Sequence, residues 1–228
     1  MNIAIILAGG TGTRLGADRP KQYIEVNNKP ILAYSMQGLS VHSGIDAIWI
    51  VADEMWRDYI CAHVDMEKVK GFSQPGENRQ LSIWNALRDI RDIADEESVV
   101  FIHDAARPIL TMAMISDYLK SVKGHDGVIP VLPMKDTVYL SKDGRTITSL
   151  LERREVVAGQ APELFVYGKY YRANERLFPD KILGINGSTE PAILAGMDIV
   201  TVPGDEWNFK VTTRADLERF RQLVENDK

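Results

Sequence analysis

The sequence predicts an α/β fold, in which a mostly parallel β-sheet is flanked by helices. Its apolar residues gather in short runs that are rich in β-branched side chains and bounded by turn formers or charges, as in strands covered on both faces. The four clearest runs are residues 3–7, 47–51, 99–102 and 127–131. Between these runs, apolar residues recur at helical spacing over residues 30–39, 79–92 and 112–122. Strands that alternate with helices in this way build a parallel sheet.

The pattern changes after Pro133. Two segments of alternating apolar and polar residues surround the turn Asp143-Gly144, which is the signature of a β-hairpin. Because alternation leaves one face of a hairpin in water, we expect residues 134–158 to form an arm that projects from the sheet. The sequence contains no internal repeat and no linker rich in Pro, Gly or Ser. Residues 1–228 are therefore predicted to form a single domain from which the arm, residues 134–158, projects.

Composition narrows the classes of function. The 228 residues are 45% hydrophobic and carry a net charge of −5 without a run of five basic residues, which argues against nucleic acid as the main partner. The longest apolar run, residues 3–8, is too short to cross a bilayer and makes a poor signal peptide, so we expect a cytoplasmic protein with no membrane partner. The single cysteine, Cys61, excludes a disulfide framework and is expected to be a buried thiol.

The first predicted strand runs into a glycine-rich loop, Leu7-Ala-Gly-Gly-Thr-Gly-Thr-Arg-Leu-Gly16. The glycines at positions 9, 10 and 12 permit tight turns, and successive backbone N–H groups in such a loop can cradle phosphate oxygens. The glycine spacing matches neither the dinucleotide fingerprint nor the P-loop. A Rossmann enzyme that transfers hydride is further disfavoured, because no acidic residue ends a second strand near position 30.

Two cations distinguish this loop from an ordinary turn. Arg14 lies within it, and Lys21 follows in the segment Arg19-Pro-Lys-Gln-Tyr23. Together they can clamp a triphosphate, the guanidinium by bidentate contact and the ammonium as a point charge. The alternative is a glycine-rich turn between strand and helix that carries surface cations.

The loop and the Pro20-Lys-Gln-Tyr23 segment resemble the opening of the sugar nucleotidyltransferases. More narrowly, they resemble the cytidylyltransferases that act on 2-C-methyl-D-erythritol 4-phosphate or ribitol 5-phosphate. This resemblance implies a Rossmann-like nucleotidyltransferase sheet, CTP and a polyol phosphate as substrates, and Mg²⁺ or another divalent cation as cofactor. It makes Arg14 and Lys21 catalytic cations. It also assigns nucleotide binding to Leu7, Ala8, Gly9, Gly10, Thr11 and Gly12.

A second segment, Gly76-Glu-Asn-Arg-Gln-Leu-Ser82, is similar to the family's G-x-x-R-x-x-S before a helix. The resemblance implies that Gly76, Arg79 and Ser82 contact the nucleotide, with the cytosine held by backbone groups and a hydroxyl. From the residues alone, Arg79 and Ser82 at a helix start are better explained as capping and surface groups.

The segment His103-Asp-Ala-Ala-Arg-Pro108 directly follows the predicted strand at 99–102. Ligands of open parallel sheets gather at the carboxyl ends of the strands, so chemistry is expected at Asp104 and Arg107. Asp104 can hold Mg²⁺ or the ribose with Arg107 in support, and the alternative is a salt bridge that closes a loop. The resemblance adds Ala105 to the nucleotide site and assigns Arg107 to the acceptor. His103 is interpreted as structural, because no second histidine lies at a metal-like spacing.

The segment 207–217, Trp-Asn-Phe-Lys-Val-Thr-Thr-Arg-Ala-Asp-Leu, resembles the family's N-x-K-V-T-x-x-x-D-L. In the family this lysine faces the α-phosphate and stabilises charge in the transition state, which makes Lys210 a catalytic candidate. Without the resemblance, Lys210 is an ordinary strand lysine. Thr213 and Asp216 are predicted to form a capping box for the last helix.

The resemblance also places acceptor contacts on the arm. Thr137 is expected to touch the phosphate or hydroxyls of the acceptor, although strand propensity alone explains a threonine there. By its offset from Gln160-Ala-Pro162, Arg153 matches the arginine that the family's arm lends to the neighbouring subunit, with Arg154 as its rival. Such a contact requires a homodimer that exchanges its arms, residues 134–158.

Two segments depart from the family's pattern. Where the family carries Thr-Asp in the acceptor loop, this chain has Ile185-Asn-Gly-Ser-Thr-Glu190, in which Asn186 can replace a hydroxyl contact. The family's Gln-Thr-Pro-Gln is Gln160-Ala-Pro-Glu163 here. We expect transfer of CMP from CTP to a polyol phosphate, with 2-C-methyl-D-erythritol 4-phosphate narrowly ahead of ribitol 5-phosphate. A regulatory protein that binds nucleotide without turnover is the alternative from another class, and CTP turnover separates the two.

Overall fold

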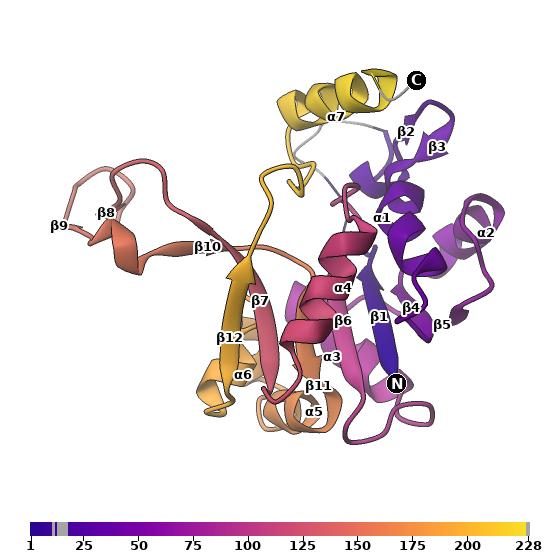
Figure 1. Cartoon of the computed structure of the whole chain (residues 1–228), viewed down its shortest axis with the longest axis horizontal. Coiled ribbons are helices and arrows are strands. Elements are labelled where there is room, and N and C mark those ends of the chain that lie inside the picture. The colour runs from indigo at the N-terminus through magenta and orange to yellow at the C-terminus, as the bar shows by residue number, and fades with distance from the viewer. Residues whose placement is uncertain (11, 13–17, 227–228) are drawn as a thin grey trace.

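The described residues form an eight-stranded, mostly parallel sheet with helices on both faces (Figure 1). The structure is a computed structural model that describes residues 1–10, 12 and 18–226. One strand, β12 (Ile199–Pro203), pairs in parallel with β7. The other strands follow one another in space as β10 (Val157–Gly159), β7 (Gly127–Pro133), β11 (Glu163–Val166), β6 (Val99–Asp104), β1 (Asn2–Leu7), β4 (Ala47–Val51) and β5 (Val69–Ser73). The predicted α/β fold is confirmed.

The centre of the sheet consists of strands that the apolar runs predict. β1 pairs in parallel with β4 on one side and with β6 on the other, and Leu7 lies opposite both Val51 and Asp104. Residues 3–6 of β1 are fully buried, because helices cover both faces. The parallel register brings the ends of three strands to one edge of the sheet. β11 is inserted antiparallel between β6 and β7, which the apolar pattern does not predict.

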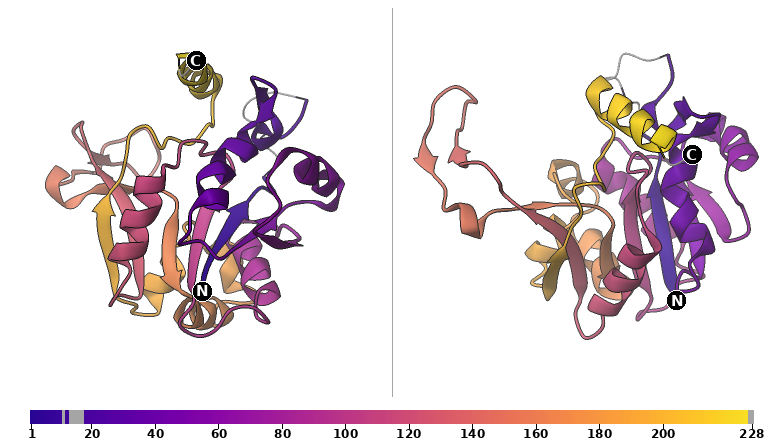
Figure 2. Two further views of the ribbon diagram at one scale, coloured as in Figure 1. Left: turned by 45° about the vertical axis from the view of Figure 1, so that its right-hand side comes forward. Right: turned by 45° about the horizontal axis from the view of Figure 1, so that its top comes forward.

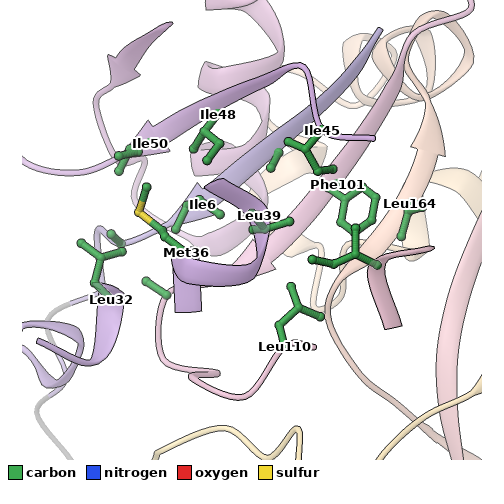
Figure 3. Close-up of a cluster of buried hydrophobic side chains, with 14 of the residues drawn as sticks. Ile6, Leu32, Met36, Leu39, Ile45, Ile48, Ile50, Phe101, Leu110 and Leu164 are labelled. Carbon is green, nitrogen blue, oxygen red and sulfur yellow. The ribbon is translucent and has the colours of Figure 1, made fainter. Parts of the chain in front are cut away.

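One face of the sheet is covered by α1 (Ile31–Val41), α2 (Glu54–His63) and α4 (Met112–Ser121). In Figure 3, Leu32, Met36 and Leu39 of α1 lie in one cluster with Ile6 and Ile50 of the sheet. The spacing of these three side chains along α1 is that of a single helical stripe, so the helix buries one side against the strands.

The opposite face is covered by α3 (Arg79–Asp89), α5 (Tyr167–Glu175) and the short α6 (Glu190–Leu194), which follows the 3₁₀ turn Lys181–Gly184. Tyr170 of α5 stacks on Phe165 of β11, with ring centroids 4.1 Å apart. The helix predicted over 79–92 ends at Asp89.

The last helix, α7 (Arg214–Asn226), packs against α1 near the small hairpin of β2 (Glu25–Val26) and β3 (Lys29–Pro30). Phe220 meets the ring of Tyr34 edge-on, with centroids 5.1 Å apart. The predicted capping box is confirmed: Asp216 N donates to Thr213 Oγ1 (3.2 Å), and Thr213 N donates to Asp216 Oδ2 (2.8 Å).

The arm, residues 134–158, extends away from the sheet in both Figure 1 and Figure 2. Its strands β8 (Tyr139–Leu140) and β9 (Ser149–Leu150) pair antiparallel. The predicted turn lies between them, where Gly144 has a φ of +69° and Asp143 Oδ1 accepts from Thr146 N (2.7 Å). The predicted hairpin is therefore present.

One expectation about burial is wrong. Cys61 lies on α2 and is exposed. This helix buries the adjacent Ile60 against the core, which leaves Cys61 on the side that faces solvent. The lack of a partner cysteine does not decide which side of an edge helix a cysteine occupies. Across the described part of the chain, no helix combines the length and apolar character needed to cross a membrane.

Candidate functional site

A cavity of about 420 Å³ lies at the edge of the sheet where β1, β4 and β6 end. Its volume is in the range of small-molecule sites. The predicted site residues that line it are Leu7, Gly9, Gly10, Gly12, Lys21, Gly76, Arg79, Ser82, Asp104 and Lys210. The structure thus brings together motifs that are spread over most of the chain.

Residues 8–10, at the start of the glycine-rich loop, are held in place by the 3₁₀ turn Lys21–Tyr23. The side-chain amide of buried Gln22 donates to the carbonyls of Ala8 (2.5 Å) and Gly10 (2.8 Å), and Tyr23 Oη donates to Ala8 O (3.0 Å). Gly12 has a φ of +67°, and a Cβ there would lie 2.7 Å from the backbone nitrogen of Lys21. Only glycine suits this position, because the backbone is left-handed and crowded.

Gln22 is a site residue that the sequence reasoning missed. The Pro-Lys-Gln-Tyr segment carries it next to Lys21, but no local pattern indicates that its amide turns back onto the loop. Its hydrogen bonds to two carbonyls fix the direction of the backbone at residues 8–10, and Gln22 also lines the cavity.

The loop at the start of α3 is closed by Ser82. Gly76 N donates to Ser82 Oγ (2.9 Å), and that hydroxyl donates to Asn78 O (2.9 Å). The helix cap is Asn78, whose side chain accepts from Leu81 N (2.7 Å), so neither Arg79 nor Ser82 has the capping role considered from the sequence. A Cβ on Gly76 would lie 2.5 Å from the Leu81 side chain, which makes this a close turn that needs glycine.

Asp104 is the centre of a charge cluster. Its Oδ1 accepts from Arg79 Nε (3.2 Å), and its Oδ2 lies 3.4 Å from Arg107 Nε and 3.0 Å from Lys210 Nζ. Burial alone raises the pKa of Asp104, but the three cations together hold that pKa well below its usual range. One carboxylate thus faces three cations, and the excess positive charge suits a bound phosphate.

The salt bridge between Asp104 and Arg107 that the sequence offered as an alternative is present, as one part of this cluster. Arg107 also donates from Nη1 to Asn208 O (2.7 Å), and Val211 N donates to Ala106 O (2.8 Å). These bonds hold the segment before α7 against the end of β6 and so bring Lys210 to Asp104. Lys210 lies outside the strands, so its interpretation as a strand lysine is wrong.

His103 is fully buried beneath the cluster. Its Nε2 donates to Arg107 O (3.2 Å), and burial lowers its pKa to about 4. A neutral imidazole with this bond agrees with the structural role expected for it.

Several predicted site residues do not line the cavity. Ala8 and Ala105 are buried, and Arg107 belongs to the Asp104 cluster without being part of the lining. The lining also excludes Thr137, Arg153 and Asn186. Thr137 and Arg153 belong to the arm. Asn186 is exposed, and its backbone N–H donates to Glu190 Oε2 (2.9 Å). Two further predicted residues, Thr11 and Arg14, lie outside the described residues.

The carboxylates that line the cavity are Glu77 and Asp104. Within residues 1–10, 12 and 18–226, no three His, Cys, Asp or Glu side chains gather to hold a metal ion by themselves. Mg²⁺ at phosphate-transfer sites is usually bound by one or two carboxylates together with the substrate's phosphates. Asp104 fits that role, because it is ionised and lies in the cavity wall. Both carboxylate oxygens of Asp104 already contact cations, so Asp104 can supply only part of the coordination of a metal ion. The site therefore fits an ion whose other ligands come mainly from the nucleotide's phosphates.

Comparison with known proteins decides the family. The family model described as "IspD: 2-C-methyl-D-erythritol 4-phosphate cytidylyltransferase" matches residues 2–226. The chain belongs to the IspD family. The predicted family and the predicted class of enzyme, a cytidylyltransferase, are thereby confirmed.

Relatives within the IspD family carry two names. A ribitol-5-phosphate cytidylyltransferase of Vibrio parahaemolyticus is 31% identical over 229 residues, which cover 99% of this chain and 96% of that protein. A 2-C-methyl-D-erythritol 4-phosphate cytidylyltransferase of Thermotoga neapolitana is 34% identical over 226 residues, covering 98% and 97%. The solved IspD structure of Francisella tularensis has a TM-score of 0.83 at 25% identity and covers 97% of this chain and 98% of its own. The IspD fold thus extends over nearly the whole chain.

Proposed function

We propose that this IspD-family chain transfers CMP from CTP to a small polyol phosphate and releases pyrophosphate, with 2-C-methyl-D-erythritol 4-phosphate as the first candidate acceptor. The observation that best supports the proposal is the meeting of Arg79, Arg107 and Lys210 on Asp104 beside the glycine-rich loop. A site with excess positive charge next to backbone N–H groups suits a nucleoside triphosphate.

In the proposed reaction, a phosphate oxygen of the acceptor attacks the α-phosphorus of CTP. The bond from that phosphorus to the bridging oxygen breaks, and pyrophosphate leaves with the electron pair. The nucleophile is already an anion, so the step needs positioning and charge stabilisation rather than a general base. Lys210 is assigned to the α-phosphate, and Lys21 with the amides of the glycine-rich loop to the β- and γ-phosphates.

The remaining cavity residues are assigned to the nucleoside and the metal. Gly76 and Ser82, which form one closed loop, would receive the cytosine through backbone groups and the hydroxyl. Mg²⁺ bound with CTP would neutralise phosphate charge, and Asp104 is the residue that would hold it. Because the pKa of Asp104 is well below its usual range, that carboxylate stays ionised at neutral pH.

The acceptor site is proposed to need a second copy of the chain. Thr137 and Arg153 lie on the arm, and a second cavity of about 410 Å³ at the base of the arm is lined by Arg153, Arg154 and Lys135. These cations suit a phosphate, but the arm extends away from the sheet of its own chain (Figure 2). We therefore propose a homodimer in which each arm completes the neighbour's acceptor site.

Ribitol 5-phosphate is the alternative acceptor, because a relative with that name is nearly as similar as one named for methylerythritol phosphate. The test is pyrophosphate release with Mg²⁺, each of the four nucleoside triphosphates, and a panel of both polyol phosphates, glycerol 3-phosphate and a hexose 1-phosphate. The expected result is release with CTP and one polyol phosphate. CTP binding without release on any acceptor would favour the regulatory alternative, and turnover of another triphosphate alone would overturn the choice of base.

A further inference from the structure

A second carboxylate lies behind the Asp104 cluster. Glu163 of β11 is opposite Ile102 of β6, and Asp104 follows two residues later on the same face of the sheet. Ser188 Oγ donates to Glu163 Oε2 and accepts from Arg79 Nη1 (2.5 Å). Arg79 in turn donates from Nε to Asp104 (3.2 Å). The result is a continuous series of hydrogen bonds that leads from Glu163 through the Ser188 hydroxyl and Arg79 to Asp104.

The hydroxyl of Ser188 has one proton, and the partner to which it donates sets the direction of these hydrogen bonds. When Glu163 is ionised, it accepts the hydrogen bond that the Ser188 hydroxyl donates, and a lone pair of Ser188 Oγ is left to accept from Arg79. A protonated Glu163 can itself donate to Ser188, which then has two donors and must turn its own proton elsewhere. The ionised carboxylate is therefore the form that holds the Arg79 guanidinium against Asp104.

The position of Ser188 is supported independently of Glu163. Ser188 is buried, and its carbonyl accepts from Tyr170 Oη (2.7 Å). Tyr170 is itself held by the amide of Gln80, which donates to Tyr170 Oη (3.0 Å) and to Asn174 Oδ1 (2.5 Å). A substitution at Glu163 can thus change the charge next to Ser188 while the backbone of Ser188 stays anchored.

The charged and titratable groups around Glu163 come from several elements. Burial is the main reason that the pKa of Glu163 is raised to about 7. Asp104 also raises this pKa, whereas Arg79, Arg107 and Lys210 lower it. Tyr170 of α5 also lies close; burial raises the pKa of its phenol, and the charge of Glu163 raises it further. Glu163 is therefore a group whose charge changes near neutral pH within a cluster of otherwise constant charges.

Glu163 and Ser188 belong to the two segments in which this chain departs from the family's pattern, 160–163 and 185–190. The segments are distant in sequence, and these two side chains meet in the structure. Glu163 on β11 thus brings a carboxylate to Ser188 of the 185–190 segment, and Ser188 in turn contacts Arg79.

We propose that Glu163 is a positioning residue that acts through Ser188 to orient Arg79 on Asp104 and to couple the 185–190 segment to the nucleotide cavity. This inference rests on the proposed cytidylyltransferase reaction. It predicts that the rate depends on the charge of Glu163, whereas a merely structural glutamate would affect stability alone.

The test compares the kcat of wild type, Glu163→Gln and Ser188→Ala from pH 6 to pH 8, with CTP, Mg²⁺ and the preferred acceptor at saturation. With a pKa of about 7, the ionised fraction of Glu163 rises about tenfold over this range. We expect wild-type kcat to rise by up to that factor relative to Glu163→Gln, which keeps the shape of the side chain but has no charge. Ser188→Ala should flatten the profile in the same way, because it removes the hydroxyl that connects Glu163 to Arg79.

The matched control is Glu175→Gln, an exposed carboxylate on α5, which should keep the wild-type profile. Circular dichroism and thermal unfolding of each variant establish that it is folded, and if Glu163→Gln does not fold, Ser188→Ala carries the test. A wild-type pH profile in the folded Glu163→Gln or Ser188→Ala enzyme would overturn this inference alone. Absence of pyrophosphate release from wild type with every acceptor would overturn the proposed function, and this inference with it.

Discussion

Lys210 Nζ lies 3.0 Å from Asp104 Oδ2, although Lys210 precedes the last helix and Asp104 ends a central strand. The side chain of Lys210 is 35% exposed and that of Asp104 is 9% exposed, so the lysine is at the mouth of the cavity and the carboxylate is in its wall. Because Arg79 and Arg107 also contact Asp104, Lys210 can turn toward a phosphate without leaving the carboxylate unpaired.

Replacing Lys210 tests this arrangement. We expect Lys210→Ala to fold normally and to lose roughly 10²–10³-fold in kcat, about 3–4 kcal/mol, because a preorganised cation is removed from the developing charge. The measurements are kcat for pyrophosphate release and thermal unfolding. Lys169→Ala, which breaks an ion pair with Asp126 outside the cavity, is the control. Near-normal turnover in Lys210→Ala would remove Lys210 from the mechanism.

Gln22 should matter for nucleotide affinity, because its amide holds the backbone of residues 8–10, where the glycine-rich loop begins. Gln22→Ala removes the buried hydrogen bond to the carbonyl of Ala8 and the partly buried one to the carbonyl of Gly10, at a cost of about 1–3 kcal/mol for the two together. We expect the Kd for CTP, measured by calorimetry, to rise by roughly tenfold or more on this scale. Gln37→Ala removes an exposed glutamine on α1 and should leave the Kd unchanged. An unaltered Kd in Gln22→Ala would show that the loop keeps its shape without the amide.

His103 gives a stability that depends on pH. Burial lowers its pKa to about 4, below the value of about 6.5 in an unfolded chain, so the unfolded state binds more protons between these values. Its contribution is complete above pH 6.5 and is lost as the pH falls toward 4, with a slope of at most about 1.4 kcal/mol per pH unit. Urea unfolding of wild type and His103→Gln across this range measures it. The difference between the two proteins should change with pH, and a constant difference would contradict the prediction.

Removing divalent metal should abolish turnover and leave the fold intact. Within the described ranges, no cluster of three metal-ligating side chains exists whose loss of an ion would unfold the chain. We expect EDTA to stop pyrophosphate release and added Mg²⁺ to restore it, while Tm in the absence of nucleotide changes little. Full activity in EDTA would contradict the proposed role of Mg²⁺, and a large fall in Tm would indicate a structural metal.

The arm should form the dimer contact. It exposes apolar side chains that a folded monomer would otherwise leave in water, among them Tyr139, Ile147 and Leu150. We expect wild type to sediment as a dimer and Leu150→Lys to shift toward monomer with loss of turnover. Arg153→Ala and Arg154→Ala, compared by KM for the acceptor, identify which arginine reaches the neighbouring site. A monomeric and fully active wild type would overturn the proposed exchange of arms.

Local patterns predict much of this fold. The strands β1, β4, β6 and β7, the helices α1, α3 and α4, and the hairpin of the arm follow from apolar periodicity and turn chemistry, which act between near neighbours in sequence. The antiparallel β11 is too short for such a signal, and the exposure of Cys61 depends on how α2 sits at the edge of the sheet.

The sequence by itself determined the fold class through its apolar pattern, and the family and the segments that form the cavity through motifs that resemble known ones. Both kinds of signal are carried by local runs of residues. The tertiary structure alone decided that Arg79, Arg107 and Lys210 share Asp104, and that Glu163 reaches Arg79 through Ser188. Strand register and the packing of α3 and the segment before α7 set these contacts. Interactions between charges depend on the distance between them in space. No local sequence pattern indicates that distance for residues that are far apart in the chain.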